Sequence, residues 1–217
     1  MTASTETLDD LRLRLAPMVA GNAAFDGWSG KALEATALQS GTDADVVALA
    51  FDGGPLAMID AWFASVDAAM HAALPPETLA EMRVGPRIRA LVQARLAILA
   101  PHREALRRAQ AVLAMPQNLP HAARLGWHAA DVMWRAAGDT ATDLNHYSKR
   151  TTLGAIYAAT LLFFVNDESE DQADTLAFLD RRLAGIARFE KAKARFTPNP
   201  DMRFSVARFL GRLRYPA

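Results

Sequence analysis

Two histidines of the chain each lie three residues from an aspartate, a spacing at which both side chains share one face of a helix. The pairs are His128 with Asp131 and Asp143 with His146. An imidazole beside a carboxylate could exchange a proton or bind a metal ion. A di-iron helical bundle would also need glutamate ligands and Glu-x-x-His repeats from other helices, and the sequence lacks them. We therefore expect no metal site.

Motifs for other catalytic chemistry are also missing. The chain has no cysteine, which excludes disulfides and thiolate chemistry and fits a reducing cytoplasm. It has no phosphate-binding loop, dinucleotide fingerprint or nucleophile elbow; the sequence Gly-Trp-Ser-Gly at 27–30 is only a near miss. With no assembled acid–base set, we expect a protein that is not an enzyme and that binds no cofactor.

The elements that hold these residues are predicted to be consecutive helices. Half of the 217 residues are apolar, enough for a sizeable core, and Ala and Leu dominate over β-branched residues. Apolar periodicity and Pro or Gly breaks predict an all-α fold with no strand. The expected helices are 7–20, 30–39, 42–50, 56–73, 86–100, 101–114, 122–137, 145–165, 169 or 171 to 194, and 203–214.

The most specific motif of the chain is the polar segment 137–150, before the uncharged stretch 151–166. That stretch is shorter than the ~20 residues of a membrane span, which favours a buried helix. Thr142 and Asp143 could cap that helix. Capping does not explain the polar and aromatic residues that follow, a composition typical of a partner-binding patch. These residues are Asn145, His146, Tyr147, Lys149 and Arg150.

The same segment resembles the signature of the coenzyme Q protein nine family, accessory proteins of ubiquinone biosynthesis whose fold is similar to that of TetR-type regulators. Members of this family read close to Asp-x-x-Thr-Asp-Phe-Asn-Trp-Tyr-x-Lys/Arg-Arg. In this chain Leu144 replaces the usual Phe and His146 replaces the usual Trp. The matching positions are Asp139, Thr142, Asp143, Asn145, Tyr147, Lys149 and Arg150.

The resemblance implies a TetR-like homodimer that binds an isoprenoid quinone or a precursor lipid and presents it to a ubiquinone-pathway hydroxylase. It places Asp143 and Tyr147 in the patch that binds the hydroxylase. His146 lies at the position of the usual Trp, and we expect Met133, on the preceding helix, to border the patch.

Large apolar residues on the two helices beside the signature are candidates for the lipid site. Each could be an ordinary core residue. A helix that is apolar on all faces can also line a ligand cavity, and the resemblance implies a lipid with an isoprene tail. We expect the cavity walls to include Trp127, Trp134, Tyr157, Leu161 and Phe164.

The end of the chain predicts a basic amphipathic helix after a linker that contains two prolines. Apolar residues recur at i, i+3, i+4 and i+7 with arginines between them, a pattern suited to an anionic membrane surface, as the resemblance also implies. Docking on the protein's own body or on a dimer mate is the alternative. The predicted membrane-binding residues are Arg203, Val206, Arg208, Phe209, Leu210, Arg212, Leu213 and Arg214.

Charge separates the predicted regions although the net charge is zero. Residues 1–60 carry three basic and nine acidic residues, whereas 181–217 carry ten basic and two acidic. DNA binding needs Lys and Arg against the phosphates, so we expect the N-terminal helix-turn-helix to be vestigial and to bind no nucleic acid. The expected regions are a helix-turn-helix-like segment (1–55), a ligand-binding and dimerisation body (56–196), and a linker with the membrane helix (197–217).

The N-terminus lacks a basic stretch followed by an apolar one, so no secretory signal is expected. The expected location is cytoplasmic, peripheral on the inner face of a bacterial membrane. Two alternatives from other classes stay open. One is a TetR-like, ligand-sensing transcriptional regulator, and the other is a membrane-associated scaffold whose interior is merely packed.

Overall fold

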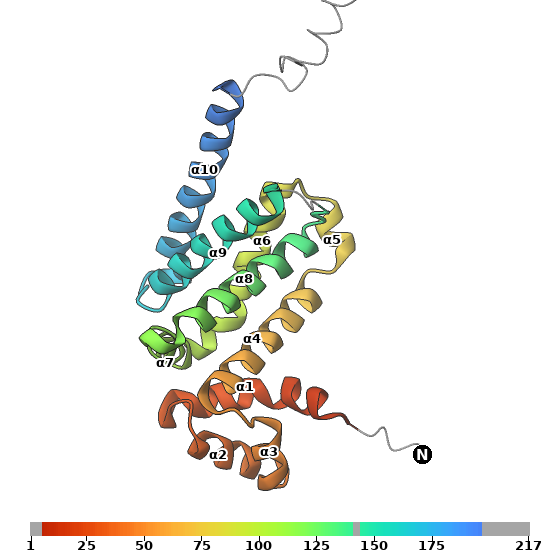
Figure 1. Cartoon of the computed structure of the whole chain (residues 1–217), viewed down its shortest axis with the longest axis vertical. Helices are drawn as coiled ribbons and strands as arrows, with labels where there is room; N and C mark the ends of the chain where they lie inside the picture. Colours follow the sequence, from red (N-terminus) through yellow and green to blue (C-terminus); the bar gives the residue numbers. More distant parts are fainter. Residues whose placement is uncertain (1–5, 141–143, 197–217) are drawn as a thin grey trace, which may run out of the picture. The chain divides into compact units, whose positions relative to one another are not determined.

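The computed structural model describes residues 6–140 and 144–196, with residues 144–145 and 187–196 described as backbone only. Within these residues every regular element is helical, so the all-α prediction is confirmed. Figure 1 shows their arrangement. The elements are α1 (Leu8–Asp26), α2 (Gly30–Ser40), α3 (Ala44–Ala50), α4 (Gly54–Ala73), α5 (Pro76–Ala80), α6 (Val84–Leu99), η1 (Ala100–His102), α7 (Arg103–Leu113), η2 (Pro116–Asn118), α8 (Leu119–Ala136), α9 (Leu144–Phe164), η3 (Glu170–Gln172) and α10 (Ala173–Phe196).

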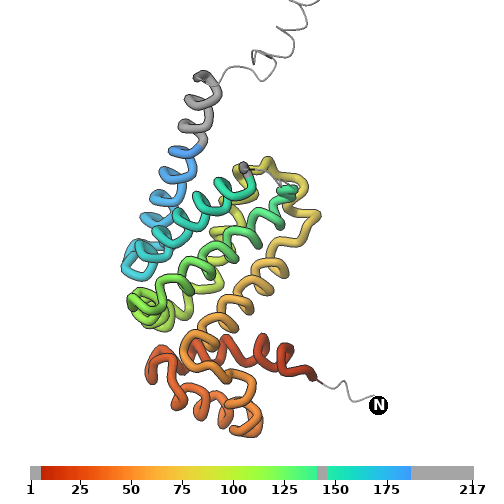
Figure 2. Tube along the Cα trace, viewed as in Figure 1, coloured from red at the N-terminus to blue at the C-terminus, as the bar shows by residue number. Residues whose placement is uncertain are grey.

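The first three helices pack on one another and form the helix-turn-helix-like order expected from the sequence. α1 starts with a capping box between Thr7 and Asp10 and runs six residues past its predicted end at residue 20. The buried face of α1 continues to Ala23, so packing extends the helix. Gly41 ends α2 in the left-handed conformation, where a residue without a Cβ is favoured. Figure 2 follows this order in red and orange along the backbone.

Two tryptophans join the N-terminal helices to the rest of the first compact unit, which ends at Leu179. Trp62 of α4 is 1% exposed, and its ring centroid lies 5.2 Å from that of Trp28. The indole N–H of Trp28 donates to the carbonyl of Ala105 on α7 at 3.1 Å. A buried indole needs such an acceptor, so this bond fixes the loop before α2 against α7.

α8 and α9 pack side by side, as Figure 1 shows, and they approach closely at Gly154. A Cβ built on Gly154 would lie 3.1 Å from the carbonyl oxygen of Gly126. Gly154 therefore allows the short distance between these helices, since a side chain at this position of α9 would push α8 away.

The structure corrects several predicted boundaries. α5 was not predicted, because Pro75 and Pro76 indicated only the end of the preceding helix; Pro76 also starts a new turn. α8 begins at Leu119 rather than at residue 122, because Pro120 lies in the first turn, where a missing N–H costs nothing. The predicted helix 203–214 lies outside the described residues.

The second compact unit begins at Asp180, and its described part is the remainder of α10 to Phe196. Within the described residues, no single helix has the length and hydropathy of a membrane span. α3 and α4, bent by 82° at the break between them, meet those criteria only when they are taken together.

Candidate functional site

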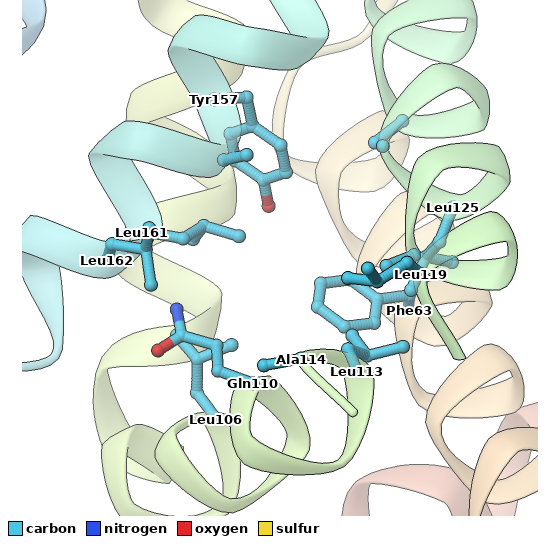
Figure 3. Close-up of a pocket in the computed structure, with 14 residues that line it drawn as sticks. Phe63, Leu106, Gln110, Leu113, Ala114, Leu119, Leu125, Tyr157, Leu161 and Leu162 are labelled. Carbon is cyan, nitrogen blue, oxygen red and sulfur yellow. The ribbon is translucent and has the colours of Figure 1, made fainter. Parts of the chain in front are cut away.

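An apolar cleft with a volume of about 240 Å³ lies between α4, α7, α8 and α9 (Figure 3). An apolar cavity of roughly 150 Å³ is enough to bind benzene, so this cleft has room for a ring or a short branched chain. Its lining residues are Phe63, Leu106, Gln110, Leu113, Ala114, Leu119, Ala122, Leu125, Gly126, Ala129, Tyr157, Ala158, Leu161 and Leu162.

Helical spacing explains why these side chains face one space. Leu106, Gln110 and Leu113 recur at i, i+4 and i+7 on α7, and Tyr157 and Leu161 are four residues apart on α9. The α8 wall is built largely from small residues, including Gly126, whose carbonyl Gly154 of α9 approaches. Leucines of three helices thus surround space that the alanines and the glycine leave unfilled.

A buried polar cluster lies behind the cleft. The Tyr157 hydroxyl accepts a hydrogen bond from Nε of Arg95 at 2.9 Å, and the guanidinium carbon lies 5.0 Å from the centre of the tyrosine ring. Arg95 is fully buried and forms an ion pair with Asp67. The second carboxylate oxygen of Asp67 lies 3.3 Å from Nε2 of His128. Burial raises the pKa of Tyr157 against the opposing effect of Arg95, so its phenol stays protonated at neutral pH.

The structure places the five predicted lipid-site residues in different surroundings. Tyr157 and Leu161 line the cleft. Trp127 turns toward Tyr147, and Trp134 donates from Nε1 to the carbonyl of Lys149 at 3.1 Å. Phe164 is fully buried beneath the guanidinium of Arg103, whose central carbon lies 4.5 Å from the ring centre.

The sequence interpretation missed the walls that α4 and α7 supply. The predicted residues all lie on the two helices beside the signature, whereas Phe63, Leu106 and Leu113 come from elements well before it. The signal that could have found α7 is its amphipathic pattern, with one apolar face between charged ones. That pattern shows which face is buried, but it does not show that part of the face stays unfilled.

Charged residues of the signature join α8 to α9. Lys149 Nζ lies 2.7 Å from Asp139, and Arg150 contacts both Asp139 (3.1 Å) and Asp131 (2.5 Å). Burial raises the pKa of Asp139, but hydrogen bonds from Lys149 and Arg150 outweigh this effect and hold that pKa below its usual range. Asp131 therefore pairs with arginine and not with His128, which separates the predicted histidine–aspartate pair. Within the described part of the chain, no three His, Asp or Glu residues are grouped as a metal site requires.

Two signature residues, His146 and Tyr147, lie against Trp127 of α8, and these three residues are called the aromatic patch. The Tyr147 ring centroid lies 6.0 Å from that of Trp127 and 5.2 Å from that of His146. Tyr147 is 60% exposed. Met133, expected to border the patch, is instead completely buried in the core, because its side chain points to the inner face of α8. Asp143 lies outside the described residues.

The C-terminal end of α9 is held by arginines of α7. Arg107 donates to the carbonyl of Val165 at 2.6 Å, and Arg103 donates to that of Asp167. Cations are favourable at this end of a helix dipole. The Asp167 carboxylate then accepts from the backbone N–H groups of Ser169 and Thr175, each at 2.9 Å, and from both hydroxyls. It thereby connects α9 to the start of α10.

Asp167→Asn is expected to lower the free energy of unfolding by about 1–2 kcal/mol at pH 7, the usual effect of losing a helix cap. Burial raises the pKa of Asp167, but bonds from Ser169 and Thr175 dominate and lower it to about 2. A depressed pKa gives stability that is present above the unfolded pKa of roughly 4 and is lost as the pH falls through about 2. Urea unfolding at several pH values should show that the difference in unfolding free energy between wild type and Asp167→Asn becomes smaller as the pH falls from roughly 4 to about 2. Glu168→Gln, at an exposed neighbour, should change little.

The comparison with protein families matches the part of the chain that contains the signature. The model of the COQ9 family matches residues 119–190, which hold α8, α9, the α8 and α9 walls of the cleft and the aromatic patch. The resemblance to the COQ9 family is confirmed.

Curated proteins are also similar to part of the chain. The mitochondrial ubiquinone biosynthesis protein COQ9 of Rattus norvegicus is 42% identical over 96 residues, and that of Homo sapiens is 41% identical over 96 residues. These alignments cover 44% of this chain but only 31% and 30% of the relatives, so the chain spans about a third of their length. The Drosophila melanogaster COQ9 protein is 27% identical over 185 residues, 83% of this chain and 56% of that protein.

Among solved structures, the chain is similar to a TetR transcriptional regulator from Nitrosomonas europaea, with a TM-score of 0.65. The similarity covers 82% of this chain and 98% of that one at 24% sequence identity. The TetR-like fold predicted from the sequence is therefore confirmed. At this identity the likeness concerns the fold alone.

The COQ9 relatives correct the expected location. The chain was predicted to lie in the cytoplasm on the inner face of a bacterial membrane, and this prediction is wrong, because the relatives are mitochondrial proteins. A chain without cysteine and without a secretory pattern is compatible with several compartments. These features alone could not select the bacterial cytoplasm.

Proposed function

We propose that the protein is a lipid-binding accessory factor of ubiquinone biosynthesis. It binds a polyprenylated intermediate in the cleft and presents it to a quinone-ring hydroxylase at the membrane. The observation that carries the proposal is the apolar cleft, whose α8 and α9 walls fall inside the COQ9 match. The names of the curated relatives, ubiquinone biosynthesis proteins, supply the pathway. The protein acts by binding and not by catalysis.

Partitioning explains why such a factor is needed. Removing one CH₂ group from water is favourable by about 0.8 kcal/mol, so each five-carbon isoprene unit contributes about 4 kcal/mol. A long prenyl tail therefore stays in the membrane, and its ring reaches a water-soluble enzyme only with help. The cleft encloses one end of such a lipid, and the rest leaves through its open side. Homodimer formation and membrane binding by residues 203–214 belong to the same proposal, and that segment lies outside the described residues.

The helix-turn-helix-like segment is not proposed to bind DNA. Asp43 at the start of α3 accepts from the backbone N–H groups of Asp45 and Val46, at 2.8 and 3.3 Å, so a carboxylate occupies the end of the helix that would face a phosphate. Glu34 and Asp45 are exposed beside it. A cluster of carboxylates repels a nucleic acid backbone.

The aromatic patch is proposed to bind the hydroxylase. Trp and Tyr are enriched among the few residues that dominate the energy of an interface. Tyr147→Ala is expected to weaken binding of a purified ubiquinone-pathway hydroxylase by at least about tenfold, the range of interface hot spots, without changing lipid uptake. His146→Trp should strengthen it, because the indole adds apolar area. Binding is measured by surface plasmon resonance.

A matched control for the patch is Phe25→Ala, which removes an aromatic ring that is 83% exposed on α1. It should leave hydroxylase affinity unchanged. Equal losses for Tyr147→Ala and Phe25→Ala, or no loss for either, would contradict the assignment of the patch.

The proposed lipid role is tested by extracting the purified protein with organic solvent and identifying the carried lipid by mass spectrometry. A polyprenyl phenol or quinone in roughly equimolar amount supports the proposal. A protein that carries no lipid after expression in a ubiquinone-producing host contradicts it and favours the alternative of a membrane-associated scaffold that binds no ligand.

A further inference from the structure

Among the described residues that line the cleft, Tyr157 and Gln110 have polar side chains. They come from α9 and α7, on different walls. Figure 3 shows the Tyr157 hydroxyl pointing into the space and the Gln110 amide near the opposite end. The other lining side chains are apolar, so these two side chains offer a ligand hydrogen bonds within the described cleft.

The hydrogen bond that Tyr157 accepts from Arg95 leaves its own hydroxyl hydrogen available to a ligand. Nε of Arg95 donates to the hydroxyl oxygen at 2.9 Å, so the tyrosine accepts on that side. Its own hydrogen meets no acceptor in the contacts of the described residues. Tyr157 is only 2% exposed and Arg95 is fully buried. A buried donor without an acceptor is unfavourable, and the free direction of this donor faces the cleft.

Arg95 and Asp67, which lie behind Tyr157, keep its hydroxyl a hydrogen-bond donor. Arg95 is held by its ion pair with Asp67, and it cannot turn around to accept, since a guanidinium has donors only. Its remaining nitrogen, Nη2, is buried without a partner, so the cluster as a whole has an excess of donors over acceptors. A positive charge behind a hydroxyl also polarises the O–H bond and makes it a stronger donor. The cluster thus favours a ligand oxygen with good acceptor strength.

We propose that Tyr157 determines ligand specificity by donating a hydrogen bond to a ring oxygen of the bound lipid. The ligand class is a prenylated ring with a carbonyl or phenolic oxygen, and its ring lies inside the cleft while the tail leaves through the open side. Gln110 can donate or accept on the opposite wall, which suits a ring with oxygens at opposite positions. This inference rests on the proposed function, because it names the part of the lipid that the cleft recognises.

The test compares two probes with the same tail. The affinities of 2-decyl-1,4-benzoquinone and of decylbenzene are measured by displacement of 1-anilinonaphthalene-8-sulfonate from the full-length protein. Wild type should prefer the quinone by about three- to tenfold, the effect of one net hydrogen bond. Tyr157→Phe should bring the ratio close to one and leave decylbenzene affinity unchanged. Ser40→Ala, which removes a hydroxyl on α2 outside the cleft, should keep the wild-type ratio.

Tyr157→Phe also removes the oxygen that accepts a hydrogen bond from Arg95. A second measurement therefore uses the wild-type protein alone. In the infrared spectrum of the wild-type complex, one carbonyl band of the bound quinone should move to lower wavenumber than in hexane. Equal affinity for both probes, an unshifted carbonyl band, or a preference retained by Tyr157→Phe would overturn the role of Tyr157 while leaving the proposed function intact. Failure of both probes to bind wild type would overturn both.

Discussion

Asp67→Ala is expected to reduce the free energy of unfolding by about 3–5 kcal/mol, because it removes one member of a buried ion pair. Arg95 has no exposed surface, and among the described residues Asp67 is the carboxylate that pairs with it. Unlike a buried lysine, arginine does not lose its proton to escape the cost. The folded state would then hold an uncompensated charge between α4, α6 and α9. Urea denaturation followed by circular dichroism measures the effect.

Two comparisons make this prediction specific. The double variant Asp67→Ala/Arg95→Met should recover most of the loss, because the unpaired charge is gone and Met fills a similar space. Glu104→Ala breaks exposed pairs with Arg107 and Arg108 and should cost less than about 1 kcal/mol. A double variant no more stable than Asp67→Ala would show that packing, and not the unpaired charge, explains the loss.

Ala158→Phe is expected to lower the affinity for a fluorescent prenyl lipid by more than about tenfold, since an aromatic side chain buries roughly 150–250 Å² and here would occupy the cleft itself. Ala158 lines the cleft but is exposed, so the larger side chain enters open space without displacing core atoms. Stability should therefore change by less than about 1 kcal/mol. Fluorescence titration gives the affinity, and thermal unfolding gives the stability.

The matched control is Ala155→Phe. Ala155 is also exposed on α9, one turn earlier, but does not line the cleft. This variant adds the same ring to the same helix and should bind lipid as wild type does. Similar affinities for the two variants would show that the cleft is not the lipid site.

Local patterns in the sequence were enough to predict most helices. Apolar periodicity and Pro or Gly breaks act over a few residues, so α2, α3 and α4 end within about a turn of their predicted positions. α5 was missed because five residues after two prolines are too few for a periodic signal. The end of α1 was missed because its burial depends on contacts with α2 and α4, which no local pattern contains.

The candidate site was predicted less completely, because its parts come from distant segments. Arg150 and Lys149 were predicted as partner surface, whereas they pair with Asp131 and Asp139 and hold α8 to α9. Which of several polar residues at a helix start turns inward depends on the facing helix. The cluster of Asp67, Arg95 and Tyr157 was invisible for the same reason, since its members lie 28 and 62 residues apart in the sequence.

The central claim is that the cleft between α4, α7, α8 and α9 holds the lipid. The most direct measurement is photo-crosslinking of the full-length protein with a prenylated benzoquinone that carries a diazirine on the carbon next to its ring, followed by mapping of the labelled peptides. We predict labels on Leu125, Leu161 and Leu162, and their loss in Ala158→Phe but not in Ala155→Phe. Labels confined to residues outside the cleft, or labelling of the cleft peptides that Ala158→Phe leaves unchanged, would contradict the account.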